Sequence, residues 1–176
     1  MSAPSTAFID RDGVLNRKPP EGEYVLGPEG LEILPGATGA VARLSRAGVR
    51  TVIVTNQQGV GKGLMTLEDL ELIHGRLRSA VEAEGGRIDQ LLVCPHLEGT
   101  CECRKPRIGL FVEARRRDGT IDFSDSVVIG DSASDMAAAS AIGAQAIRVT
   151  GGTGPEDGTA VPGIAEAAEL ILGRES

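Results

Sequence analysis

The sequence predicts an α/β protein built on one doubly wound parallel sheet. Short apolar segments of strand type alternate along the chain with longer segments of helical periodicity. Most of the short segments are continuously apolar, as expected when helices cover both faces of a parallel sheet. The chain has 176 residues, 41% of them hydrophobic, enough to bury a substantial core. We therefore expect a single domain over residues 1–176.

Five segments are predicted to be strands and five to be helices. The predicted strands are 6–9, 51–54, 91–93, 127–129 and 146–149. The predicted helices are 37–47, 67–84, 109–117, 133–142 and 163–172. Thr66 is a candidate N-cap because acidic residues follow it in the first helical turn, and three glycines (Gly48, Gly85 and Gly143) lie where helices should end. Residues 13–35 carry several prolines and glycines and no helical pattern, which is typical of a lid or a binding loop.

Composition excludes several classes of protein. The net charge of −7 argues against a nucleic-acid-binding protein, which needs a basic face to neutralise phosphates. No segment approaches the roughly 20 apolar residues that span a bilayer, and the N-terminal residues lack the features of a signal peptide. We expect a cytoplasmic monomer without nucleic-acid or membrane partners.

Four predicted strands are followed by polar side chains: Asp10, Thr55, Cys94 and Asp131. Ligand sites in open α/β sheets form beyond the carboxyl ends of the strands. Asp10 and Asp12 could serve as a nucleophile and as a general acid/base, with Gly13 allowing the turn. Taken alone, the pair also fits a charged surface turn. A calcium loop is excluded because its later acidic and glycine positions are missing.

The other strand ends carry weaker signals. Thr55 and the amides after it could donate hydrogen bonds to phosphate oxygens, although an ordinary polar loop has the same composition. The nearby 59–63 segment is not a P-loop, because Asn56 and Gly63 occupy positions that require glycine and Ser/Thr. Lys105 could neutralise phosphate charge, or belong to a solvated basic patch.

Asp131 suits Mg²⁺, a hard ion that carboxylates and substrate phosphate hold. Asp135, one helical turn later, could support the metal or orient a neighbouring group. The alternative for Asp131 is an aspartate that caps a helix. These two carboxylates therefore predict a magnesium site only in combination with the other strand-end residues.

Four candidate zinc ligands lie within ten residues: Cys94, His96, Cys101 and Cys103. Three thiolates and one imidazole make a closed tetrahedral set, which indicates a structural Zn²⁺ site rather than a disulfide framework or a catalytic zinc. Unrelated free cysteines are the alternative. The segment continues directly into Arg104 and Lys105, so zinc binding would fix where these cations point.

Together, these motifs resemble those of the haloacid dehalogenase superfamily, spread over residues 10–135. The resemblance implies a Rossmann-like fold with a minimal cap and a Mg²⁺-dependent phosphatase activity. It implies that Asp10 forms an aspartyl-phosphate while Asp12 acts as general acid and then general base. Thr55 and Lys105 would hold the phosphoryl group. Asp10, Asp131 and the main-chain carbonyl of Asp12 would ligate Mg²⁺.

Segments 8–16, 55–60 and 94–106 are further similar to the heptose bisphosphate phosphatase subfamily, which shares this pattern with histidinol-phosphate phosphatases. The similarity implies a phosphorylated sugar substrate, with the 7-phosphate of a heptose 1,7-bisphosphate as the group removed. The substrate-binding residues that it implies are Asn56, Gln57, Gln58, Arg104, Lys105 and Ser132. Some members have lysine at the position of Ser132, and some have a longer zinc loop. Loop residues near 18–24 are also expected to contact the substrate.

Two further hypotheses come from other classes of protein. A phosphoryl-accepting signalling domain would need neither Asp12 nor the zinc loop. A non-catalytic zinc-bearing interaction module would not need Asp10, Lys105 and Asp131 together. His74 and the Arg115–Arg117 run receive no functional role and are expected on helix faces or the solvated surface.

Overall fold

The computed structural model describes residues 2–152 and 160–173. Its centre is a parallel sheet in which six strands follow the order β3-β2-β1-β4-β5-β6. The strands are β1 (Thr6–Ile9), β2 (Arg50–Asn56), β3 (Gln90–Cys94), β4 (Ser126–Gly130), β5 (Gln145–Val149) and β6 (Ala160–Val161). The parallel sheet and its five predicted strands are confirmed. The short β6 was not predicted, because two residues carry no periodicity.

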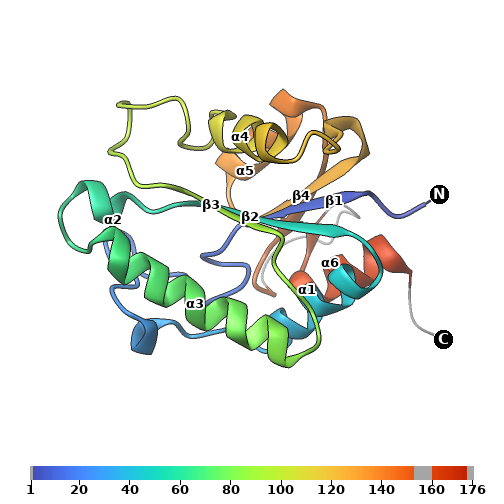
Figure 1. Ribbon diagram of the computed structural model, residues 1–176, viewed down its shortest axis with the longest axis horizontal. Helices are drawn as coiled ribbons and strands as arrows, with labels where there is room; N and C mark the ends of the chain where they lie inside the picture. Colours follow the sequence, from blue (N-terminus) through green and yellow to red (C-terminus); the bar gives the residue numbers. More distant parts are fainter. Residues whose placement is uncertain (1, 153–159, 174–176) are drawn as a thin grey trace.

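Helices cover both faces of the sheet (Figure 1). Helices α1 (Ala37–Arg46), α3 (Leu67–Ala83) and α6 (Ile164–Leu172) lie on one face, and α4 (Gly109–Arg117) and α5 (Ala133–Ile142) lie on the other. These five correspond to the predicted helices. Three shorter elements were not predicted: η1 (Pro28–Gly30), α2 (Gln58–Gly61) and η2 (Phe123–Asp125).

Each central strand is buried on both faces, which explains its continuous apolar sequence. Ile9 and Ile53 face the layer of α1, α3 and α6, while Phe8 and Val52 belong to the core cluster under α4 and α5. The ring of Phe8 lies 5.0 Å from that of Phe111 in an edge-to-face arrangement. The sheet therefore separates two apolar cores and holds the strand ends rigidly.

Local signals set the helix ends as expected. Thr66 forms a capping box with Asp69 at the start of α3, and Ser132 forms one with Asp135 at the start of α5. Gly143 ends α5 in the left-handed conformation, with φ of 75°. The second capping box orients Asp135 at the carboxyl end of β4, next to the functional residues described below.

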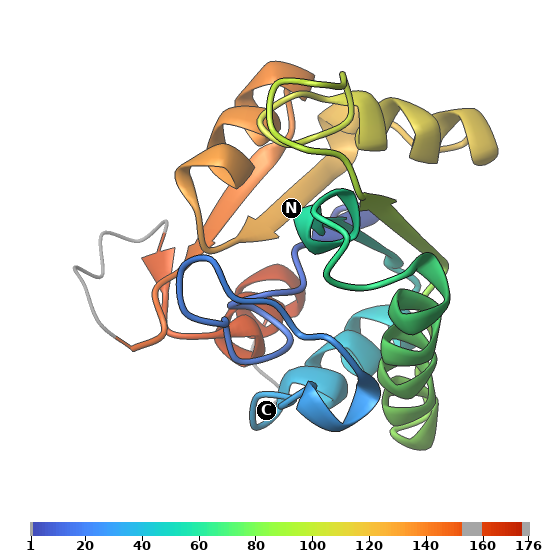
Figure 2. The same cartoon turned by 90° about the vertical axis from the view of Figure 1, so that its left-hand side faces the viewer.

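The long 13–35 connection, α2 and the segment after β3 gather at the carboxyl ends of the strands (Figure 2). The long connection pairs briefly with itself, through a bridge between Asn16 and Ile33, and contains only the short η1 turn. None of the helices in the described residues is long and apolar enough to cross a membrane.

Candidate active site and metal-binding loop

Asp10 and Lys105 form the buried centre of the site. Asp10 follows β1, and its Oδ1 accepts hydrogen bonds from the amide of Arg11 at 2.9 Å and from Lys105 Nζ at 3.0 Å. Lys105 Nζ also donates to Asp135 Oδ1 at 2.7 Å and to the carbonyl of Val54 at 2.8 Å. Lys105 is 4% exposed, and three oxygens, one after β1, one in β2 and one in the first turn of α5, hold its ammonium group in place.

Asp131 completes a group of carboxylates suited to a metal ion. Ligand oxygens of Asp10, Asp131 and Asp135 lie within 4.8 Å of one another. Asp131 Oδ1 is buried without a hydrogen-bond partner in the described structure, as expected of an oxygen reserved for a cation. Gly13 has φ of 87°, and a Cβ there would collide with the Asp131 carboxylate. Carboxylate oxygens are the ligands that Mg²⁺ prefers, so this group fits the predicted magnesium site.

The electrostatics of the group also favour a cation. Burial, together with the charges of Asp135 and Asp131, raises the pKa of Asp10 to about 8, although Lys105 acts in the opposite direction. A divalent ion would reverse this effect by favouring the ionised carboxyl. Lys18, from the 13–35 loop, supplies a positive charge here, since its Nζ lies 2.7 Å from Asp131 Oδ2.

Asp12 is held on both of its oxygens. Arg11 donates to Asp12 Oδ1 through Nε at 3.2 Å and Nη2 at 2.9 Å, and Asn16 Nδ2 donates to the same oxygen at 2.9 Å. Gln57 Nε2 donates to Oδ2 at 2.8 Å. Although burial opposes the change, the charge of Arg11 and these hydrogen bonds lower the pKa of Asp12. The resting protein therefore holds Asp12 ionised and oriented.

Two residues at the end of β2, Thr55 and Asn56, also make hydrogen bonds within the site. Thr55 is 1% exposed, and its hydroxyl oxygen accepts a hydrogen bond from Gln57 Nε2 at 3.0 Å, which leaves the hydroxyl proton for an acceptor at the strand end. Asn56 makes two hydrogen bonds with the main chain of Lys105, accepting from its amide at 3.0 Å and donating to its carbonyl at 3.2 Å. Asn56, at the end of β2, thus fixes Lys105, and Gln57, the next residue, helps to fix Asp12.

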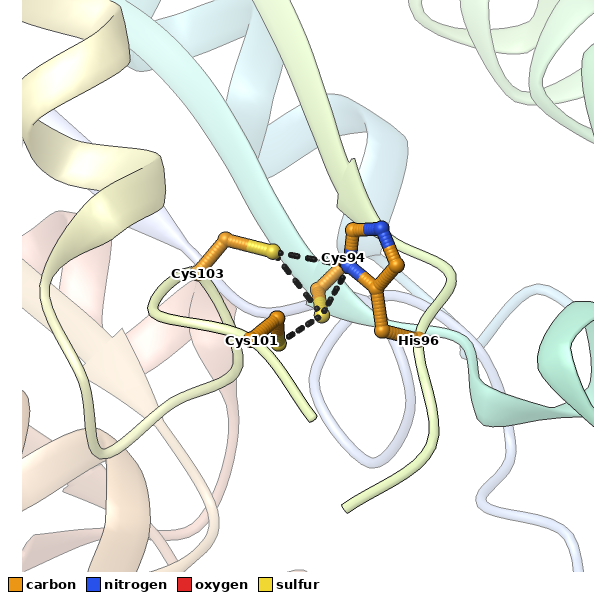
Figure 3. Close-up of side chains that lie close together, drawn as sticks. All are labelled: Cys94, His96, Cys101 and Cys103. Carbon is orange, nitrogen blue, oxygen red and sulfur yellow. Dashed lines mark hydrogen bonds between the residues drawn. The ribbon is translucent and has the colours of Figure 1, made fainter. Parts of the chain in front are cut away.

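Cys94, His96, Cys101 and Cys103 converge on one point in the segment after β3 (Figure 3). The Sγ of Cys94 lies 3.5 Å from that of Cys101 and 3.2 Å from that of Cys103. His96 Nδ1 lies 3.1 Å from Cys103 Sγ and 3.6 Å from Cys94 Sγ. Ligands of a tetrahedral zinc stand about 3.5–3.8 Å apart, given Zn–S bonds of about 2.3 Å. The four groups fit a closed zinc site, and no disulfide joins the three cysteines.

The metal-binding loop (residues 94–103) contacts the rest of the site through α2. Gln58 Oε1 accepts the amide hydrogen of Glu98 at 2.7 Å, while its Nε2 lies 3.4 Å from the hydroxyl of Tyr24 in the long loop. Gly61 packs so closely that a Cβ would meet the carbonyl of Pro95. These contacts tie the metal-binding loop, α2 and the 13–35 loop together beside Lys105.

The side chains or main chains of three predicted site residues are engaged by other parts of the protein. Both oxygens of Asp135 are engaged, one by Lys105 and one by Ser132, so Asp135 orients the lysine. The Ser132 hydroxyl is used in the helix cap and bonds Ser134 as well as Asp135. Arg104 is half-buried beside Lys105, and its main chain contacts the metal-binding loop.

Sequence reasoning assigned no role to Arg11 or His74 and named Lys18 only as a loop residue. Arg11 is fully buried, and its Nη1 lies 3.0 Å from His74 Nε2 on α3. His74 is therefore not simply a helix-face residue. A charged residue inside an active-site turn was the one available signal for Arg11, whereas the His74 contact depends on packing between segments 63 residues apart.

Comparison with known proteins places this arrangement among phosphatases. The HAD-hydrolase-like family pattern matches residues 102–170. D-glycero-alpha-D-manno-heptose-1,7-bisphosphate 7-phosphatase of Mycobacterium bovis is 44% identical over 140 residues, covering 79% of this chain and 73% of that protein. The D-glycero-beta-D-manno-heptose-1,7-bisphosphate 7-phosphatase of Rhodopseudomonas palustris is 39% identical over 153 residues, covering 82% of this chain and 83% of that protein.

Solved structures agree with these relatives. The D,D-heptose 1,7-bisphosphate phosphatase of B. bronchiseptica, crystallised with magnesium and phosphate, superposes with a TM-score of 0.85. It is 32% identical, and the match covers 95% of this chain and 97% of that chain. The relatives named here include enzymes for both the alpha and the beta anomer of the sugar.

Proposed function

This chain belongs to the haloacid dehalogenase-like family of heptose bisphosphate phosphatases, and on that premise we propose that it removes the 7-phosphate of D-glycero-D-manno-heptose 1,7-bisphosphate. The observation that carries the proposal is the buried contact of Lys105 with Asp10, beside the unpaired oxygen of Asp131. A nucleophile, a fixed cation and a metal-binding carboxylate at one sheet edge are what phosphoryl transfer requires.

In the first step, an Asp10 oxygen attacks phosphorus, and the bond between phosphorus and the sugar oxygen breaks. Asp10 Oδ1 is occupied by Arg11 and Lys105, which orient the carboxylate for attack. Asp12 donates a proton to the departing sugar oxygen, which leaves as an alcohol. The dianionic phosphate placed beside Asp12 favours the protonated carboxyl that this step needs.

In the second step, water attacks the phosphorus of the aspartyl-phosphate. Asp12, now ionised, accepts the proton from that water, so that inorganic phosphate leaves and the Asp10 carboxylate is restored. The Thr55 hydroxyl would hold a phosphoryl oxygen through both steps, and Lys105, whose three N–H groups bond Asp10, Val54 and Asp135, supplies positive charge beside the phosphoryl group. The hydrogen bonds from Arg11, Asn16 and Gln57 favour the ionised form of Asp12 that the second step uses.

Asp10, Asp131 and the main-chain carbonyl of Asp12 would hold Mg²⁺, with Asp135 supporting the group through Lys105. When bound, Mg²⁺ supplies positive charge that offsets the charge on the transferring phosphoryl oxygens. Zn²⁺ in the metal-binding loop is structural in this proposal: it fixes the segment that ends at Arg104 and Lys105. Asn56, Gln57, Gln58, Arg104 and Ser132 would contact the substrate at the same edge of the sheet.

Phosphate release from a substrate panel tests the proposal. The panel contains the alpha and beta anomers of the heptose bisphosphate, histidinol phosphate and fructose bisphosphate, each with and without Mg²⁺. We expect the highest kcat/KM with one heptose anomer and release only with the metal. A preference for histidinol phosphate would reassign the substrate within the same chemistry. No release from any compound by folded, zinc-loaded protein would contradict the enzyme assignment.

A further inference from the structure

His74 and Arg11 form a buried pair behind the proposed acid/base residue. Arg11 is fully buried, and His74, on the inner face of α3, is 6% exposed. Arg11 Nη1 lies 3.0 Å from His74 Nε2, although 63 residues separate them in the sequence. The other edge of the guanidinium, Nε and Nη2, donates to Asp12 Oδ1. Arg11 thus lies between a ring nitrogen and a carboxylate oxygen.

The chemistry of the pair fixes the direction of its hydrogen bond. An arginine guanidinium has donors only and stays protonated in proteins, so the His74 nitrogen that faces it must be the acceptor. His74 is therefore neutral, with its proton on Nδ1. Burial and the positive charge of Arg11 lower the pKa of His74 to about 3, which agrees with the neutral ring.

We propose that His74 is a positioning residue of the phosphatase reaction, which holds Arg11 in the orientation that aims the Asp12 carboxylate. The inference rests on the proposed function, since the aim of Asp12 matters because Asp12 transfers protons. Without the ring nitrogen, Nη1 would be a buried donor that has lost its acceptor, and such a group turns toward another partner. A turn of the planar guanidinium would release both of its hydrogen bonds to Asp12.

Loss of His74 would not break all of the hydrogen bonds to the Asp12 carboxylate. Asn16 still donates to Oδ1 and Gln57 to Oδ2, so the loss of His74 should misplace the carboxylate by a small amount and leave it in the site. A small misplacement weakens proton transfer without changing the binding of the phosphate, which Lys105 and Thr55 hold on the other side. The expected defect therefore lies in the proton transfers of Asp12, and kcat/KM, which covers the reaction only as far as phosphoryl transfer to Asp10, reports the transfer to the leaving group alone.

Two substrates separate this role from a structural one. A sugar phosphate releases an alkoxide that needs a proton, whereas 4-nitrophenyl phosphate releases a stable phenolate that does not. In His74→Leu, which keeps the bulk but removes the acceptor, kcat/KM for the heptose bisphosphate should fall at least about tenfold. For the aryl phosphate it should change less than about threefold. His74→Gln, whose side-chain oxygen can accept from Arg11, should restore most of the loss.

Leu77→Ala is the matched control, since it removes buried volume one turn later on the same helix. It should lower thermal stability and leave the ratio of the two kcat/KM values unchanged. Equal loss for both substrates in His74→Leu, or no loss for either, would overturn the inference. Wild-type protein that releases phosphate from neither substrate would instead contradict the proposed function.

A measurement on the wild-type protein decides the case if His74→Leu does not fold. The chain has two histidines, so long-range nitrogen–proton NMR spectra resolve each ring. The inference requires the Nδ1-protonated tautomer for His74. A proton on Nε2 would overturn it, because Arg11 would then face a second donor.

Discussion

Asn56 and Lys105 are joined by two hydrogen bonds between one side chain and one peptide unit. The Asn56 side chain accepts from the Lys105 amide at 3.0 Å and donates to its carbonyl at 3.2 Å. The lysine ammonium then reaches Asp10 at 3.0 Å. The position of Lys105 is therefore set twice: by Asn56 at the end of β2, and by the metal-binding loop that precedes it in the sequence.

Asn56→Ala should lower kcat by about tenfold or more, because Lys105 loses the two bonds that fix its main chain. Zinc content should stay unchanged, since the Asn56 side chain bonds Lys105 and the pairing of Asn56 with Cys94 in the β2–β3 ladder is made by the main chain. Gln90→Ala is the control: it removes one side-chain hydrogen bond, from Gln90 Nε2 to the carbonyl of Ala114, at the opposite end of the sheet. Unchanged kcat in Asn56→Ala would show that these two hydrogen bonds do not position Lys105.

Cys101→Ser should lose most of the bound zinc and at least about tenfold in activity, because the segment before Lys105 is no longer fixed. Metal analysis and phosphate release on the same sample measure both effects. Thr100→Ser, which keeps the hydroxyl that donates to the carbonyl of Leu97 at 2.7 Å, should match the wild type in both. Native zinc content in Cys101→Ser would contradict the ligand assignment.

Lys18→Met should strengthen Mg²⁺ binding. Lys18 Nζ pairs with Asp131 Oδ2 at 2.7 Å, so the metal has to compete with this ammonium for the carboxylate. Because the lysine side chain is 56% exposed, the gain in affinity should be no more than about fivefold, as for other exposed ion pairs. Calorimetric titration with Mg²⁺ measures it.

Arg17→Met serves as the control for charge alone. Arg17 pairs with Glu32 on the surface of the same loop, at 3.6 Å. Arg17→Met should change the Mg²⁺ affinity less than Lys18→Met does. Equal effects of the two substitutions would mean that general electrostatics, and not the Lys18–Asp131 contact, opposes the metal.

His74 should make stability depend on pH. Its pKa is about 3 in the folded protein, against an ordinary value of 6.5. Between these values the unfolded chain binds a proton that the native ring does not, so the free energy of unfolding falls as pH drops below 6.5, by up to about 1.4 kcal/mol per pH unit. Above pH 6.5 both states are neutral and this contribution is constant.

Urea denaturation at pH 7 and pH 5 measures the effect in wild type and in His74→Gln. The variant should lose about 2 kcal/mol less than the wild type over this interval. Protonation of the zinc ligands affects both proteins equally, so the difference isolates His74. The same pH dependence in both proteins would show that the ring is not buried as a neutral acceptor.

Much of this fold could be predicted because its signals are local. Apolar runs such as 127–129 mark buried parallel strands, and Asp10 and Asp131 follow such runs directly. The zinc ligands lie within ten residues, so their spacing alone indicated a site. Helix α2 was missed because four residues, two of them glycine, have no usable periodicity.

Contacts between distant segments could not be predicted. Arg11 with His74, and Lys18 with Asp131, join residues 63 and 113 positions apart, and neither pair forms a motif. Their geometry depends on how α3 and the 13–35 loop pack over the strand ends. The residues proposed to carry the reaction could thus be named from local motifs, while the contacts that hold them in place required the tertiary structure.

The central claim is that Asp10 accepts the phosphoryl group. Asp12→Asn should form the aspartyl-phosphate but hydrolyse it slowly, because the base that activates water is gone. Acid quenching of this variant with Mg²⁺ and an aryl phosphate, followed by peptide mass spectrometry, should find one phosphoryl group on the peptide that contains Asp10. The double variant that carries both Asp10→Asn and Asp12→Asn should have no phosphoryl group on this peptide. A phosphoryl group on another residue, or none in a variant that still releases the phenolate, would contradict the account.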